Sequence, residues 1–111
     1  RYFYREEASN INEIKHPVIK SILKYKKFKG NLDIVHHGDL PARSGIGSSS
    51  SFSVGMINVL NALNNIKISK KRLAKQSIHL EQNILKEKVG SQDQVAAVYG
   101  GLNCIYFHKK Y

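Results

Sequence analysis

Residues 39–51 of the chain read Asp39-Leu40-Pro41-Ala42-Arg43-Ser44-Gly45-Ile46-Gly47-Ser48-Ser49-Ser50-Ser51. Residues 32–37 before this stretch have the composition of a β-strand, and residues 49–64 have that of a helix. A Gly/Ser-rich loop that leads into a helix is typical of a phosphate site, because glycine lets the backbone approach an anion and the first N–H groups of a helix have no partner within it. The loop contains no lysine, which excludes a Walker A loop. The order strand, loop, helix therefore predicts a nucleotide-phosphate site of a different kind.

Capping residues predict the ends of the other elements. Pro17 after His16 favours a helix start, and Gly30 favours its end. Ser69 is a typical N-cap for a helix over residues 70–85. A short, Ala-rich helix that we expect to be buried lies between glycine-containing pairs at 90–91 and 100–101, and a closing strand follows at 102–107. This alternation predicts one α+β domain.

The helix over residues 49–64 and the last strand are both predicted to contribute to the core. The apolar side chains that share a face of this helix are Phe52, Met56, Val59, Leu60 and Leu63. Cys104 is the only cysteine, so no intrachain disulfide can form, and a reducing cytoplasm is the expected compartment. We interpret Cys104 as a small buried hydrophobic residue on the strand.

The composition limits the classes of partner. The net charge is +10, from 18 basic and 8 acidic residues, but the lysines are scattered and no aromatic platform lies between them. This distribution indicates a solvated surface and disfavours a nucleic-acid binder. No apolar run is long enough to span a membrane, and no signal peptide is recognisable. The chain begins at Arg1 and ends within the predicted strand, so we expect it to be a piece of a longer protein.

Glu81 interrupts an apolar face of the helix over residues 70–85. Ala74, Ile78 and Leu85 share its face at helical spacing. A carboxylate against a core is costly unless it is paired, hydrogen-bonded or bound to a metal. The alternative is that Glu81 lies at the edge of the stripe and reaches water, paired with a lysine such as Lys75 or Lys88.

Asp93 is the second candidate for chemistry. It lies in the first turn of the short helix, where the helix dipole favours a negative charge. That placement is by itself a sufficient structural reason for an aspartate. A carboxylate at the mouth of a packed element could equally accept a proton from a substrate hydroxyl.

The loop, Glu81 and Asp93 together resemble motifs of the GHMP kinase superfamily, which includes galactokinases, homoserine kinases and mevalonate kinases. Residues 41–50 match the motif P-x-x-x-G-L-G-S-S-A, with Ile46 in place of Leu and with Ser50-Ser51 in place of the usual alanines. Glu81 lies twelve residues before the Asp of a G-x-x-D-Q segment, and that segment is followed by a Gly-Gly pair, as in the family. The phrases at 40–45, 79–82 and 88–94 most resemble bacterial D-glycero-D-manno-heptose 7-phosphate kinases.

The resemblance implies a fold and a reaction. The fold is the GHMP kinase N-terminal domain, which is ribosomal protein S5 domain 2-like, with helices packed on a mixed β-sheet. Residues 1–111 would be an incomplete copy of it, without the N-terminal motif and the C-terminal domain. The reaction is transfer of the ATP γ-phosphoryl to a small-molecule sugar phosphate, at the anomeric hydroxyl of heptose 7-phosphate. Another GHMP small-molecule kinase, galactokinase-like, or a catalytically incompetent nucleotide-binding fragment is the alternative.

The resemblance also implies roles for individual residues. Asp93 would be the catalytic base, and Glu81 and the Ser49 hydroxyl would hold Mg²⁺. The residues that would bind ATP are Pro41, Ser44, Gly45, Ile46, Gly47, Ser48, Ser49 and Ser50. The oligomeric state does not follow from these motifs.

Overall fold

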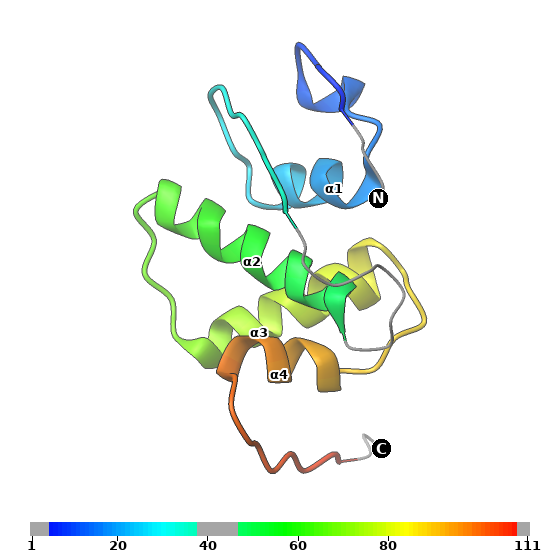
Figure 1. The fold of residues 1–111 in the computed structure, drawn as a ribbon, viewed down its shortest axis with the longest axis vertical. Helices are drawn as coiled ribbons and strands as arrows, with labels where there is room; N and C mark the ends of the chain where they lie inside the picture. The colour runs from blue at the N-terminus through cyan, green and yellow to red at the C-terminus, as the bar shows by residue number, and fades with distance from the viewer. Residues whose placement is uncertain (1–4, 38–46, 109–111) are drawn as a thin grey trace.

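The computed structural model describes residues 5–37 and 47–108, which form a layered arrangement of helices (Figure 1). Two short helical segments and four α-helices follow one another along the chain. Their bounds are η1 Ile11–Glu13, α1 Pro17–Tyr25, α2 Ser48–Leu63, α3 Lys70–His79, η2 Leu80–Ile84 and α4 Gln92–Tyr99. η1 is a 3₁₀ turn, whereas η2 is a π-helical turn that continues directly from α3.

Local capping explains where α1 and α3 begin. The Nδ1 atom of His16 accepts the N–H of Ile19 at 3.3 Å, and Pro17 occupies the first helical position. The Ser69 hydroxyl accepts the N–H of Arg72 at 3.2 Å, as predicted for an N-cap. α1 ends at Tyr25, before the predicted stop at Gly30, because the chain turns at Lys27, whose φ is +50°.

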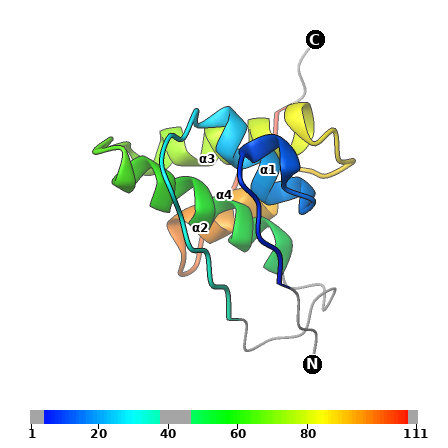
Figure 2. The ribbon, with the colours of Figure 1, turned by 90° about the horizontal axis from the view of Figure 1, so that it is seen from above.

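The core lies where α1, α2, α3 and η2 meet. Its buried apolar side chains are Ile22, Leu23, Val54, Ile57, Leu60, Leu73 and Leu80. α2 contacts α1, α3 and α4, and α1 and α4 lie on opposite sides of it (Figures 1 and 2). α2 is therefore the central element of the arrangement.

The predicted apolar face of α2 is wrong. Of its five members only Leu60 is buried, and Val59 and Leu63 each expose about half of their surface. The residues of α2 that are buried are Ser50, Ser53, Val54, Ile57, Leu60 and Asn61. Small serine side chains let neighbouring helices approach this face of α2 closely. The buried face is therefore the one that contains Ser50 and Ser53, and not the one with the most large apolar residues.

The predicted mixed β-sheet is contradicted. Residues 32–37 and 102–107 are extended, but no strand is assigned anywhere in residues 5–37 and 47–108. A strand exists only when its N–H and C=O groups pair with another strand, and alternation of side chains does not supply that partner. Leu32 packs against the core, but Val35 and Tyr106 are 77% and 80% exposed, so neither segment covers the core as a strand of a sheet would. The described architecture is all-helical, and not α+β.

Two smaller expectations are corrected as a consequence. Cys104 is exposed, because the segment that carries it leaves the helices below α4 and has no sheet to bury it (Figure 1). The body of α4 is also less buried than its alanines suggest, and Gln94 is its one buried residue. In the described part of the chain, no helix combines the length and the apolar character needed to cross a membrane.

A polar network joins α1, α2 and α3 away from the pocket described below. The Gln76 Oε1 atom accepts from Lys26 Nζ and from Asn61 Nδ2, both at 3.3 Å. Partial burial lowers the pKa of Lys26 below 10.5, and the nearby positive charge of Arg72 lowers it further.

Candidate functional site

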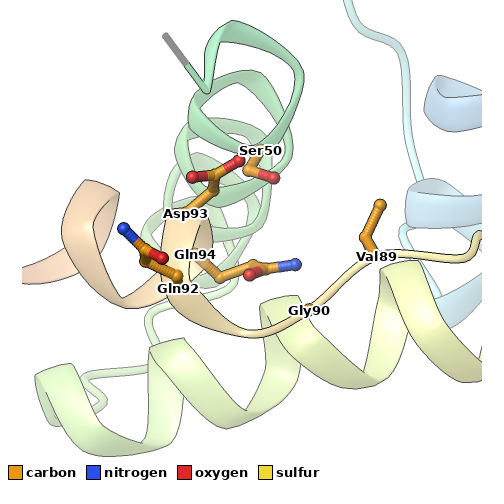
Figure 3. Close-up of a pocket in the computed structure, with 6 residues that line it drawn as sticks. All are labelled: Ser50, Val89, Gly90, Gln92, Asp93 and Gln94. Carbon is orange, nitrogen blue, oxygen red and sulfur yellow. The ribbon is translucent and has the colours of Figure 1, made fainter. Parts of the chain in front are cut away.

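A small pocket opens between the N-terminal half of α2 and the first turn of α4 (Figure 3). Its volume is about 210 Å³. The residues that line it are Ser50, Val89, Gly90, Gln92, Asp93 and Gln94. Sites for whole small molecules commonly measure about 300–1,000 Å³, so this pocket matches a phosphate group or a hydrated ion better than a complete nucleotide.

The N-terminus of α2 lies beside this pocket. Gly47 is its N-cap residue with a φ of +78°, and no side chain of the described residues caps the helix. The first hydrogen bond of the helix joins the Ser51 N–H to the Gly47 carbonyl at 3.0 Å. The N–H groups of Ser48–Ser50 precede that bond and have no partner within the helix, which is the arrangement that binds anions at helix N-termini.

Asp93 lies directly against this N-terminus. A Cβ atom on Gly47 would be 3.4 Å from the Asp93 Cγ atom and 3.6 Å from its Oδ1 atom. The carboxylate is exposed and lines the pocket. It is thus available to a ligand, as a proton acceptor must be.

Glu81 is buried behind the pocket, with 1% of its surface exposed. Its Oε2 atom accepts a hydrogen bond from the Ser50 hydroxyl at 3.0 Å and another from Gln94 Nε2 at 2.5 Å. Its Oε1 atom has no hydrogen-bond partner in the described residues. The interpretation in which Glu81 reaches water beside Lys75 or Lys88 is therefore wrong.

The π-helical turn η2 carries Glu81 at this position. The Leu85 N–H donates to the Leu80 carbonyl at 2.8 Å, which is the wider i→i+5 closure of a π-turn. The predicted single α-helix over residues 70–85 is thus α in its first part and π in its last turn. Such turns are rare and occur frequently at functional sites.

The structure brings four of the predicted site residues together. Ser50 and Asp93 line the pocket, and Glu81 lies behind it, bonded to Ser50. Gly47 lies so close to Asp93 that an added Cβ atom would touch its carboxylate. Ser49 is exposed, and the hydroxyl that donates to Glu81 belongs to Ser50. The metal-binding role of Ser49 stays a prediction. The predicted ATP-binding residues outside the described part of the chain are Pro41, Ser44, Gly45 and Ile46.

Gln94 is the site residue that the sequence reasoning missed. It is 1% exposed and contacts the carboxylate of Glu81. A weak signal was present, because Gln94 shares one side of α4 with the half-buried Ala97 and Val98 at i+3 and i+4. Because residues 91–94 are all polar, this periodicity is difficult to recognise in the sequence.

The residues of the site fit a magnesium ion. The described part of the chain contains no group of three or more His, Cys, Asp or Glu side chains that could hold a metal. Mg²⁺ does not need one, because it keeps several waters and is commonly bound through one or two carboxylates plus the phosphates of a substrate. A buried carboxylate with one unpartnered oxygen satisfies the protein's part of that requirement.

Comparison with known proteins places these residues within a family. The family described as "GHMP kinases N terminal domain" matches residues 12–101. A D-glycero-alpha-D-manno-heptose 7-phosphate kinase of Campylobacter jejuni is 35% identical over 72 residues, which are 65% of this chain and 21% of the relative. A galactokinase of Pyrococcus furiosus is 37% identical over 70 residues, 63% of this chain and 20% of the relative.

A third relative covers more of the chain. A homoserine kinase of Staphylococcus aureus is 31% identical over 114 aligned residues, 96% of this chain and 35% of the relative. The chain therefore spans between a fifth and about a third of the length of these relatives. No solved structure matches the chain significantly. The match over residues 12–101 shows that the chain belongs to the GHMP kinase N-terminal domain family.

Proposed function

We propose that this chain is part of an ATP-dependent GHMP kinase that transfers a phosphoryl group to the hydroxyl of a small molecule. The observation that supports this most directly is that Asp93 and the first turn of α2 meet at one pocket, with the Glu81 carboxylate buried directly behind its wall. An anion-binding helix terminus, a proton acceptor and a buried carboxylate for a cation are the parts that phosphoryl transfer requires, because this reaction depends on positioning and charge neutralisation.

The chain's own residues would divide the work as follows. The N–H groups of the first turn of α2 would bind phosphate oxygens, together with the loop that precedes it. Asp93 would orient the acceptor hydroxyl and accept its proton while the oxygen forms a bond to the γ-phosphorus and ADP leaves. Glu81, with Ser49, would hold Mg²⁺, which when bound neutralises phosphate charge.

For the acceptor we propose D-glycero-D-manno-heptose 7-phosphate, phosphorylated at its anomeric hydroxyl. The support is the similarity of residues 40–45, 79–82 and 88–94 to heptose phosphate kinases and the Campylobacter jejuni relative of that name. Galactose and homoserine are the competing acceptors, because the other two relatives are named for them.

The test is a kinase assay on the polypeptide encoded by the whole reading frame that contains this sequence. ADP release is measured with ATP and Mg²⁺ against heptose 7-phosphate, galactose and homoserine. We expect turnover with the heptose phosphate and little with the other two. Turnover with galactose or homoserine alone would overturn the acceptor assignment, and no turnover with any acceptor would favour an incompetent nucleotide-binding protein.

Two variants test the residue roles in the same assay. Asp93→Asn should lower kcat by about 10²- to 10⁴-fold, the usual contribution of a general base. Asp33→Asn, at an exposed aspartate in the extended segment, is the matched control and should leave kcat unchanged. Glu81→Gln should raise the Mg²⁺ concentration needed for half-maximal rate, whereas the exposed Glu87→Gln should not. Wild-type kcat in Asp93→Asn would exclude a catalytic base at this position.

A further inference from the structure

We infer that Gln94 is a positioning residue, assisted by Ser50, which fixes the Glu81 carboxylate so that one chosen oxygen remains free for a cation. The inference rests on the proposed function only in taking Glu81 as the cation ligand. Gln94 is the last residue of the G-x-x-D-Q segment, and the resemblance assigns no role to it.

Both donors bind the same oxygen of Glu81. Gln94 Nε2 and the Ser50 hydroxyl donate to Oε2, while Oε1 accepts no hydrogen bond. The three side chains come from different elements, η2, α4 and α2, and each is buried. The two contacts therefore distinguish the two oxygens of one carboxylate, because they occupy Oε2 and leave Oε1 without a hydrogen-bond partner among the described residues.

The orientation of the Gln94 amide follows from the same contact. Only its nitrogen can donate to a carboxylate oxygen, so its own Oε1 atom points elsewhere, and that oxygen has no hydrogen-bond partner in the described residues. Within residues 5–37 and 47–108, no cationic side chain bonds to these two buried oxygens. An unpaired buried acceptor is costly, which a hard cation or its bound water would remedy.

Ser50 and Gln94 also line the pocket, whereas Glu81 lies behind them. Ser50 and Gln94 are thus the side chains that both line the pocket and bond to the Glu81 carboxylate. Partners that orient a metal ligand typically affect metal affinity by about 10- to 100-fold. The motif that residues 41–50 resemble has alanine at position 50, whereas the serine of this chain supplies a hydroxyl that donates to Glu81.

The alternative is that the Gln94–Glu81 bond only docks α4 onto η2. The two interpretations differ in what happens to cation binding when the donor is removed and the fold is kept. Mn²⁺ is a suitable probe, because it is a paramagnetic stand-in for Mg²⁺ that binds oxygen ligands.

The experiment measures Mn²⁺ affinity of the full 111-residue chain by titration, with thermal unfolding of each variant recorded without metal. Gln94→Met keeps the length of the side chain but removes the donor, and should weaken Mn²⁺ binding by about 10- to 100-fold. Ser50→Ala should weaken it less, and Ser50→Thr, which keeps the hydroxyl, should restore it. The controls are Ser51→Ala, at an exposed serine, and Gln82→Met, which removes an amide donor to the Val89 carbonyl outside the cluster.

A second measurement requires no variant. Mn²⁺ should broaden the side-chain amide signal of Gln94 in the NMR spectrum of the wild-type chain well before that of Gln82. Wild-type Mn²⁺ affinity in a folded Gln94→Met protein, or equal broadening of the two amides, would overturn the inference and leave the kinase proposal standing. Wild-type Mn²⁺ affinity in Glu81→Gln would instead remove Glu81 as the ligand and overturn both the metal assignment and this inference.

Discussion

Gly47 meets two independent requirements at the start of α2. Its φ of +78° lies in the left-handed region that residues with a Cβ atom adopt at a cost. Its missing side chain also leaves space for the Asp93 carboxylate, which a Cβ atom would approach to 3.4 Å. The glycine therefore couples the helix start to the placement of the proposed base.

Gly47→Ala should destabilise the protein by about 1–2 kcal/mol through the backbone alone, with some addition from crowding at Asp93. The matched control is Gly55→Ala in the middle of the same helix, where an added Cβ meets nothing within 4 Å. That change should stabilise by about 0.5–1 kcal/mol, because alanine loses less conformational freedom in a helix. Urea unfolding measures both, and two shifts of the same sign would contradict the argument.

At the scale of elements, the starts of α1 and α3 were predictable from the sequence, whereas strands were not. Pro17 and Ser69 act through hydrogen bonds and torsions within one turn, so the local sequence contains the whole cause of the helix start. Residues 32–37 and 102–107 have suitable composition, but their state depends on a partner elsewhere. The face that α2 buries likewise depended on its neighbours, as the exposed Val59 shows.

The N-cap of α3 gives a prediction at this scale. Ser69→Ala removes the acceptor for the Arg72 N–H and should cost about 0.5–2 kcal/mol of unfolding free energy. Ser69→Asp keeps an acceptor and places a negative charge at the helix N-terminus, so it should retain or exceed wild-type stability. Thermal unfolding followed by circular dichroism distinguishes them, and equal losses in the two variants would show that the cap is not the cause.

In the candidate site too, features set by the local sequence were predictable, whereas those set by distant residues were not. Glu81 was detectable as an anomaly because a charged residue interrupts an apolar period, and Asp93 because of its place in a first turn. Gln94 belongs to the G-x-x-D-Q segment, but its role was not predicted, because nothing in the local sequence marks this glutamine as buried. The partners of Glu81 lie 31 and 13 residues away in the sequence, so only the packing of three elements reveals them.

At the scale of the whole molecule, positive charge exceeds negative charge by ten. One positive charge, that of Lys26, lies near another, that of Arg72. It is partly buried near Arg72, with a lowered pKa in the folded state. Between that lowered pKa and 10.5 the unfolded chain binds more protons than the folded one, so the unfolding free energy rises with pH in this window.

Lys26→Met should remove this contribution. We expect the stability of the wild type relative to Lys26→Met to increase as the pH is raised from neutral toward 10.5, because the other titrating groups are common to both proteins. Urea unfolding of both proteins across this range gives the difference directly. A difference that stays constant or falls with pH would contradict the lowered pKa.

Because Glu81 lies in the π-turn η2, the geometry of the site depends on the number of residues in this segment more than on which residues they are. Exposed residues between Glu81 and α4, such as Asn83 and Lys86, should tolerate exchange for other polar residues with little movement of the backbone. Deleting Asn83 would favour an ordinary α-turn, and each residue of an α-helix advances the chain by about 100° around its axis. The rest of η2 would then be rotated relative to Glu81, and the non-helical connection that leads to Asp93 and Gln94 would be displaced at its start. Insertions and deletions in this segment should accordingly separate the two halves of the site even where every side chain of the site is retained.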